Sequence, residues 1–494
     1  MGPRIQTHQT ASAPHLPVGH GADSNPHPDP TPQGGKVLEL GQAFVRTQRH
    51  FWPKFNDWLD QLPDTRYPEM IVYDTRFLAW WGLLLFSFKL GSRRQLDFQL
   101  RDMETKVLGN VNQLAQTQQE TLPVHKTLDH FLGHVGSPAI RDLRTQCIRQ
   151  LIRNKVLDDL RLDGQFVIAT DGTGFLSFSQ RHCPHCLVQK HESKTLYFHP
   201  VLEAKIVHQN GLALSIGTEF IQNPSPQTPA GISCDLVDYQ TVKQDCELKA
   251  FLRLATQLKK DFPQTGFCIG GDSLFACGPV LSVCEQNHWS YVLTFKPGRT
   301  PGLWADFQGV LKLSPENRLL LKLPNGVQQL FRWANDLSYT DSEKRTHLVH
   351  ALSCEETVDG TTQTYSWITN KPLSAKNVAK VATQGGRVRF KIENQGFNIQ
   401  KNSGLNLEHA YSIGADTMKS FYYLLQIAHL FTQMFEMGSL LRNLARRFRS
   451  TPVGLFGSLK NLAQRLLECF RFFALEAEIF NPTAPFQIRL ADTS

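Results

Sequence analysis

The sequence QFVIATDGTGF (residues 165–175) is the stretch that decides the fold. Residues 166–170 are apolar or β-branched, which is typical of a buried strand. Asp171, Gly172 and Thr173 follow directly and form a turn signal. We therefore expect a strand that runs into a loop, with the Asp171 carboxylate at the end of the strand.

The segments that follow this strand alternate between strand and helix patterns. Two strand-like stretches come first, separated by the hairpin signal Gln209-Asn210-Gly211. A helix, a buried strand, a second helix and a further strand come next, at residues 245–262, 266–270, 279–287 and 290–296. The order β-β-β-α-β-α-β predicts an α/β fold, with a mixed sheet flanked by helices.

The chain before residue 163 has a different character. Residues 1–36 are rich in proline and poor in apolar side chains, which predicts a disordered tail. Apolar residues then recur at three- and four-residue spacings up to residue 162, which predicts a helical domain. The run FLAWWGLLLF (77–86) is about half the length that a bilayer span needs, so we expect a buried core helix and a soluble protein.

The pattern changes again after the last strand of the sheet. Residues 304–370 contain several strand-like stretches, beginning with VLKL (310–313), and predict an inserted all-β subdomain. Helical patterns return from Ser374. The predicted segments are a tail (1–36), a helical domain (37–162), the sheet domain in two parts (163–303 and 371–440), the β insertion between them (304–370), and a basic helical tail (441–494).

Composition narrows the class of protein only slightly. The 494 residues carry a formal net charge of +8, which fits a polyanionic partner and also fits many soluble enzymes. Of ten cysteines, only Cys183 and Cys186 form a tight pair, so we expect a reducing cytoplasm. With ligands from the nearby histidines His182, His185, His191 and His199, of which we choose His191, this pair is either a Zn²⁺ site or a reduced structural loop.

Two carboxylates are candidates for the chemistry. Asp171 follows the first strand and Asp272 follows the buried strand at 266–270, so both project toward one edge of the sheet. Paired carboxylates at such an edge are typical ligands of Mg²⁺. Each Asp alone would also fit a turn or a helix cap. Ala169 occupies the position at which a phosphatase of the DGT type carries its nucleophilic Asp, which argues against that class.

Several motifs resemble those of one enzyme family. They are DGTGFLSFS, CPHC, TLYFHPVLEAKIV, TEFIQN, QDCELKAFLRL, GGDSLFACGP and RVRFKIENQGFNIQKNSGLNLEHAYS. In this joint order, across roughly residues 60 to 440, they resemble the DDE transposases of bacterial insertion sequences. The resemblance implies a ribonuclease H-like catalytic domain with a β insertion between the second Asp and the Glu.

The resemblance also implies a set of site residues. Asp171, Asp272 and Glu393 match the three acidic residues, which hold Mg²⁺ or Mn²⁺. Arg389 stands one helical turn before Glu393 and fits the Arg-x-x-x-Glu signature of one subgroup, in which it could hold a phosphate. Lys401 matches the Lys of that subgroup, although it lies one place later than expected.

Other residues in these motifs fit the family's site less well or have another expected role. Gly386 stands where the subgroup has Tyr. Asp245 is expected to cap the helix that begins beside it. Further acidic residues lie in family-like motifs and are less favoured than Glu393: Glu219, Glu247 and Glu408.

The function implied is transposition of a mobile element, namely metal-dependent cleavage of transposon ends and strand transfer into target DNA. The partners would be double-stranded DNA with terminal inverted repeats and a second copy of the chain, in a bacterial cytoplasm at the nucleoid. Two alternatives remain: a ribonuclease H-like nuclease without strand transfer, and an inactive DNA-binding descendant.

The expected DNA contacts lie outside the acidic triad. Arg149 and Arg153, on the helical domain, are either a solvated face or a contact to the DNA backbone. In the β insertion, Trp333, Tyr365 and Trp367 either stack on an extruded base or fill the subdomain's own core.

Overall fold

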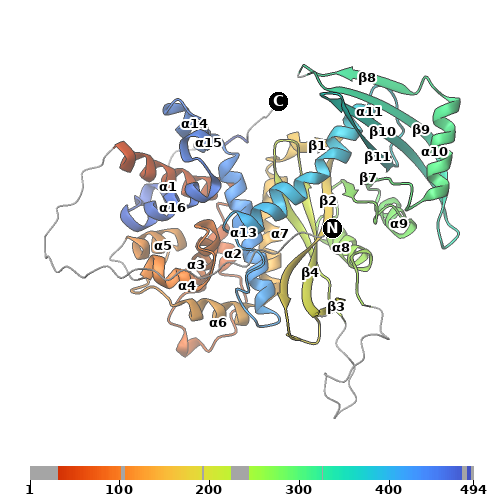
Figure 1. Cartoon of the computed structure of the whole chain (residues 1–494). Coiled ribbons are helices and arrows are strands. Elements are labelled where there is room, and N and C mark those ends of the chain that lie inside the picture. Colours follow the sequence, from red (N-terminus) through yellow and green to blue (C-terminus); the bar gives the residue numbers. More distant parts are fainter. Residues whose placement is uncertain are drawn as a thin grey trace, which may run out of the picture.

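The computed structural model describes residues 32–101, 106–191, 194–223, 244–324, 326–480 and 487–490. It is a mixed α/β structure, which confirms the predicted class. Figure 1 shows a body of helices on one side, a sheet in the middle, and the strands β8 to β11 at the far end.

One sheet of eleven strands runs through the described part of the chain. Its order is β3-β4-β2-β6-β7-β11-β10-β9-β8, with β5 paired to β4 and β1 to β2. The pairs β2/β6 and β6/β7 are parallel, and the other pairs are antiparallel. The strands are β1 (Arg161–Leu162), β2 (Gln165–Phe178), β3 (Leu187–His191), β4 (Lys194–Val207), β5 (Ala213–Phe220), β6 (Phe267–Gly271), β7 (Ser290–Thr294), β8 (Arg318–Lys322), β9 (Gln328–Thr340), β10 (Thr346–Val358) and β11 (Thr361–Thr369).

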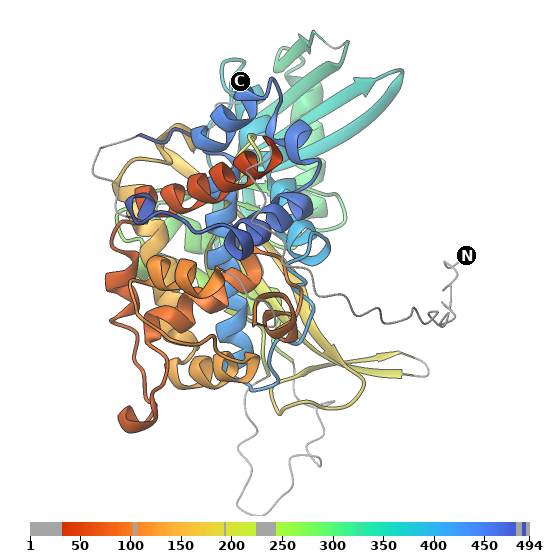
Figure 2. The same ribbon diagram turned by 90° about the vertical axis from the view of Figure 1, so that its left-hand side faces the viewer.

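The helical body combines both ends of the described chain. Helix α16 packs against α1 and α5, and the two terminal regions lie together in Figure 2. The predicted helix at 77–86 lies within α3, where every one of these residues is buried. The helices are α1 (Pro32–Phe51), α2 (Phe55–Leu59), α3 (Thr75–Ser87), α4 (Arg94–Leu96), α5 (Val107–Ala115), α6 (His125–Val135), α7 (Ser137–Arg153), α13 (Thr417–Glu436), α14 (Ser439–Arg447), α15 (Pro452–Phe456), α16 (Leu459–Phe472) and α17 (Ala477–Phe480).

Each face of the sheet is covered by different helices. Because side chains alternate along a strand, Phe166 and Ile168 pack into the larger hydrophobic cluster, whereas Val167 and Ala169 pack into a smaller one. Helices α8 (Glu247–Asp261) and α9 (Gly278–Asn287) belong to the larger cluster. The smaller cluster is covered by a helical segment of α11 (Val378–Lys380), η5 (Val381–Gly386), η6 (Arg387–Arg389), η7 (Ile392–Asn398) and α12 (Ile399–Asn402).

Three local predictions differ from the structure. Strand β2 continues through Asp171 and Thr173, predicted as a turn, because β4 pairs with it along that length. The predicted strand 310–313 is the end of helix α10 (Pro301–Leu313), where Leu303 and Phe307 are buried at a four-residue spacing. The predicted tail (1–36) overlaps α1, which begins at Pro32, and residues 1–31 lie outside the described residues.

The strands of the predicted insertion extend the main sheet. Strand β11 pairs antiparallel with β7, with Ile368 opposite Leu293, so the sheet is continuous from β6 to β8. No helix in the described part of the chain is both long enough and apolar enough to cross a membrane.

Candidate active site

The two candidate aspartates lie along or just beyond neighbouring parallel strands. The register of β2 and β6 ends with Ala169 opposite Gly270. Asp171 stands two residues further along β2, and Asp272 follows Gly271, the last residue of β6. By alternation, Asp171 faces the same side of the sheet as Ala169, which is the side covered by the helical segment 378–402.

The helical segment brings Glu393 to this edge. Arg389 and Glu393 are four residues apart, and Arg389 Nη1 lies 2.9 Å from Glu393 Oε1. The same nitrogen donates to Asp171 Oδ2 at 3.3 Å. Because one nitrogen contacts both carboxylates, Asp171 Oδ2 and Glu393 Oε1 can be no farther apart than the sum of these two distances. The structure thus brings three of the predicted residues, Asp171, Arg389 and Glu393, into one contact group.

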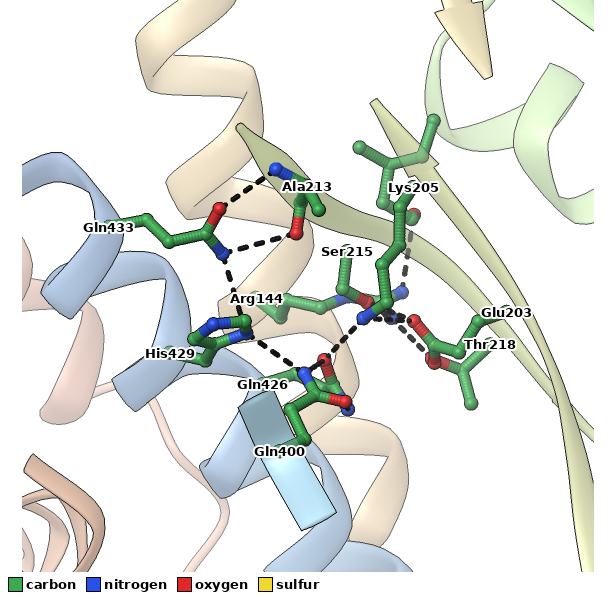
Figure 3. Close-up of polar contacts among 11 residues, drawn as sticks. Arg144, Glu203, Lys205, Ala213, Ser215, Thr218, Gln400, Gln426, His429 and Gln433 are labelled. Carbon is green, nitrogen blue, oxygen red and sulfur yellow. Dashed lines mark hydrogen bonds and ion pairs between the residues drawn. The ribbon is translucent and has the colours of Figure 1, made fainter. Parts of the chain in front are cut away.

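A buried polar network fixes the position of this helical segment (Figure 3). At its end, Gln400 donates to Gln426 Oε1 at 2.8 Å and to His429 Nδ1 at 2.9 Å, both on α13. Lys205, on β4, donates to the same Gln426 oxygen at 2.9 Å. Gly396 packs against the Lys205 side chain. The segment that carries Glu393 is therefore held against both α13 and the sheet.

Strands β4 and β5 and helix α7 complete the network. Glu203 is fully buried and accepts hydrogen bonds from Ser215 at 2.7 Å and from Thr218, and it pairs with Lys205 at 3.2 Å. Arg144 in turn donates to Thr218 at 2.6 Å and to Ser215 at 3.2 Å. The buried charges of this network are thus paired or hydrogen-bonded, as buried charges must be.

A fourth carboxylate reaches the site from the other face of the sheet. Glu247 is the first residue of α8, and its carboxylate lies against Gly172, where an added Cβ would stand 2.0 Å from Oε1. The absence of a side chain at Gly172 makes this approach possible. Glu247 stood among the less favoured acidic residues, because its sequence position at a helix start gave no indication of which strand it would meet.

The charges at this edge do not balance. The pKa of Asp171 is raised to about 7 by burial and by the negative charges of Glu393 and Glu247, although Arg389 opposes that rise. Burial and the charge of Asp272 also raise the pKa of Glu247. Arg389 contacts two of these carboxylates, Asp171 and Glu393, and no described ion pair joins Glu247 or Asp272 to a cation. An excess of negative charge of this kind is the electrostatic setting in which a bound cation is stabilising.

The spacing of the four carboxylates limits how a cation could be held. In the described part of the chain, no three of them have oxygens close enough together to share one ion. A metal ion at this edge would therefore be held by pairs of carboxylates.

The other acidic residues of these motifs have partners elsewhere. Arg253 lies 2.5 Å from Glu219 and 2.7 Å from Asp245. Helix α8 begins at Glu247 after Cys246, so the prediction that Asp245 caps it is wrong; Asp245 instead accepts hydrogen bonds from the backbone of Gln222 and Cys246. The ion pair with Arg253 explains why the Asp245 carboxylate does not cap the start of α8.

Glu408 and Lys401 form an ion pair with each other at 2.7 Å. Glu408 is mostly exposed, and no described contact joins it to Asp171. This geometry favours Glu393 over Glu408 as the third acidic residue. Lys401 lies two turns beyond Glu393 in the same helical segment, with its ammonium group partly exposed.

Arg149 and Arg153, the basic residues predicted on the helical domain, lie far from the carboxylates. Arg149 Nε donates to the carbonyl of Asp261, the last residue of α8, at 2.8 Å. Helix α8 has 15 residues and rises about 1.5 Å per residue, so its two ends are roughly 20 Å apart, on the order of a DNA duplex diameter. Arg149 and Arg153 line an open surface hollow with Lys54.

The aromatic residues of the β strands are mainly interior. Trp333 and Trp367 are 5% and 4% exposed and belong to the smaller hydrophobic cluster. The Arg387 guanidinium lies 3.9 Å from the centre of the partly buried Tyr365 ring. Gly386 touches the Trp367 indole, where an added Cβ would stand 2.4 Å from Cε2. The indole thus occupies the space that a Tyr at position 386 would need.

The Cys183 and Cys186 pair belongs to a larger cluster. His182 and His199 join the two cysteines, and the four ligand atoms all lie within 4.8 Å of one another. In the described part of the chain this is the one group of three or more such residues that could hold a metal ion. The predicted third ligand, His191, is in β3, and its side chain lies outside the described residues.

His182 and His199 were among the nearby histidines that the sequence offered as ligands, but His191 was the one chosen. The antiparallel register of β2 and β4, which places His199 opposite Leu176, brings it to the CPHC loop. Such a pairing is a long-range property that residue spacing does not reveal. No family model matches this chain, and a search of curated proteins finds no match either, so the candidate site rests on its own geometry.

Proposed function

We propose that this chain is a DDE-type DNA transposase of an insertion sequence. The observation that supports this best is Arg389, which contacts both Asp171 and Glu393 at the edge where Asp272 follows the neighbouring strand. The element order β2, β4, β5, α8, β6, α9, β7 is also the order that a ribonuclease H-like domain of this family implies.

The acidic edge fits divalent metal ions of the hard type, Mg²⁺ or Mn²⁺. Its carboxylate oxygens are the preferred ligands, and its excess negative charge favours a cation. Bound there, two such ions would stabilise the attacking and leaving oxygens of a phosphodiester. In this proposal Asp171 would serve both ions, one together with Asp272 and the other together with Glu393.

The remaining groups would position the DNA. Arg389 is held by two carboxylates and presents a planar fork that suits a phosphate. Arg149, Arg153 and Lys54 would grip the backbone at a second place, because the length of α8 separates them from the acidic edge. The proposal includes a homodimer on paired DNA ends, in the cytoplasm at the nucleoid.

A strand-cleavage assay tests the function. The substrate is a duplex that carries the short inverted repeats flanking this reading frame, incubated with the full chain and Mg²⁺. We expect nicking at the repeat ends, followed by joining to a target duplex. The variants Asp171→Asn, Asp272→Asn and Glu393→Gln should lose both steps, whereas the matched carboxylate control Glu408→Gln should keep them.

Each other outcome has a definite meaning. Nicking that survives in the three variants would refute the proposed site. Cleavage without joining would favour the ribonuclease H-like nuclease. Binding of the repeats without any cleavage by the unaltered chain would favour the inactive DNA-binding descendant.

A further inference from the structure

A second potential metal site lies in the Cys/His cluster, apart from the acidic edge. His182, Cys183 and Cys186 lie between β2 and β3, and His199 lies on β4. Cys186 and His199 are buried, whereas His182 and Cys183 are partly exposed. The cluster therefore forms a pocket of soft and imidazole ligands, the set that zinc prefers.

The distances between ligand atoms match a tetrahedral zinc site. The sulfurs of Cys183 and Cys186 are 3.7 Å apart, and His199 Nε2 lies 3.6 Å from the first and 3.2 Å from the second. With Zn–S of about 2.3 Å and Zn–N of about 2.0 Å, a tetrahedron has S–S edges of about 3.8 Å and S–N edges of about 3.5 Å. A disulfide would need sulfurs about 2.05 Å apart, so the pair is not oxidised here.

A metal-free cluster, held by hydrogen bonds alone, explains these contacts less well than a zinc site does. The buried His199 Nε2 faces the two cysteine sulfurs, and His182 Nδ1 is buried with no hydrogen-bond partner among the described residues. Thiols are weak hydrogen-bond donors and acceptors, so they compensate poorly for the burial of imidazole nitrogens. The His182 ring stacks on Phe178, with centroids 4.3 Å apart and an angle of 8° between the planes, which fixes its orientation.

Backbone contacts hold the cysteine loop in place. Asn223 donates from Nδ2 to the Cys186 carbonyl at 3.0 Å and from its backbone to the His185 carbonyl at 3.2 Å. Gln244 accepts from Val188 N at 2.8 Å and donates to Val188 O at 3.0 Å. These contacts tie the loop to the residues just after β5 and just before α8, and α8 begins with Glu247.

We propose that His182, Cys183, Cys186 and His199 bind one structural zinc ion. Four protein ligands close the coordination sphere, so the ion would have no open position for a substrate. Its role would be to fix the cysteine loop and, through Gln244, the start of α8. The proposal does not depend on the transposase function.

Metal analysis of the full chain tests the proposal. The protein is purified without chelators or affinity histidines, and zinc is measured by mass spectrometry. We expect one zinc ion per chain after dialysis against excess Mg²⁺. Modification of the thiols should release that zinc, and replacement by Co²⁺ should give the absorption bands of thiolate coordination.

Variants locate the ion. Cys183→Ser should reduce zinc to background, whereas the exposed Cys246→Ser should retain the full amount. Asp171→Asn should also retain it, which separates this ion from any metal at the acidic edge. Absence of zinc from the unaltered protein would overturn the proposal, as would full zinc content in Cys183→Ser. The wild-type release and Co²⁺ measurements remain decisive if a variant fails to fold.

Discussion

Two groups of charged residues lie within the same fold and differ in how their charges are compensated. The network around Glu203 is buried, and Lys205, Ser215 and Thr218 all contact its carboxylate. At the acidic edge, Arg389 is the cation in contact with Asp171 and Glu393, and Asp272 and Glu247 add further negative charge. The buried network thus holds one carboxylate with two cations, Lys205 and Arg144, whereas the acidic edge holds several carboxylates near one guanidinium.

This difference distinguishes charges that the protein compensates internally, as around Glu203, from charges that could attract a partner, as at the acidic edge. A charge inside the protein must be compensated by the protein, because burial without a partner costs several kcal/mol. A partly exposed edge with excess negative charge instead leaves room for a partner from solution. The comparison leads to four predictions, ordered from the largest expected effect to the smallest.

Glu203→Gln should destabilise the fold most. It leaves Lys205 buried without its carboxylate, which costs about 3 to 5 kcal/mol. Urea unfolding should show this loss, and the additional change Lys205→Met should recover part of it because one of the two buried cations, Lys205 and Arg144, is then removed. An unchanged urea midpoint in Glu203→Gln would show that the network is not compensated as the contacts indicate.

Asp171→Asn should lower the cleavage rate without lowering the stability of the fold, the reverse of Glu203→Gln. Under the proposed function, loss of a shared metal ligand would remove several kcal/mol of transition-state stabilisation, a rate decrease on the order of 10³-fold. The urea midpoint should stay the same or rise, because one of several repelling charges is gone. A large loss of stability would place Asp171 in the structural class with Glu203.

Gly172→Ala tests the approach of Glu247 to the strand. The new Cβ would meet the Glu247 carboxylate, which must then move away. We expect a decrease in cleavage rate of about tenfold, equivalent to about 1.4 kcal/mol. Gly174→Ala is the matched control, since nothing lies within 4 Å of its added Cβ. Equal rates for the two variants would remove Glu247 from the site.

The fourth prediction concerns pH. The raised pKa of Asp171, about 7 against 3.8, means that the folded protein binds a proton that the unfolded chain releases. Without metal, the stability should therefore fall as pH rises from about 4 to about 7. Thermal melts should show this slope in the unaltered chain and a weaker one in Asp171→Asn. Added Mg²⁺ at a pH just above the raised pKa should increase the melting temperature of the unaltered chain more than that of the variant.

Much of the sheet could be predicted because its signals are local. Alternating apolar residues and the hairpin signal at 209–211 identified β4 and β5, and the spacing of apolar residues identified α8. The predicted end of β2 was wrong, because pairing with β4 extends the strand through the turn signal at Asp171. The strand expected at 310–313 was wrong because burial of Phe307 favours a helix.

The part of the candidate site that a single short motif encodes could be predicted from the sequence. Arg389 and Glu393 lie one helical turn apart, so their contact follows from spacing. Glu247 and His199 reach their clusters through contacts between elements that are distant in sequence. Such contacts depend on the register of strands and on helix packing, which no short motif encodes.

The continuity of the sheet from β7 to β11 has a consequence for any shortened form of this protein. Removing residues 304–370 would expose the backbone N–H and C=O groups of β7 that now pair with β11. An open strand edge of this kind is a template for aggregation. The insertion is therefore also an edge cover, and a deletion that keeps the acidic residues would need a substitute strand to stay monodisperse.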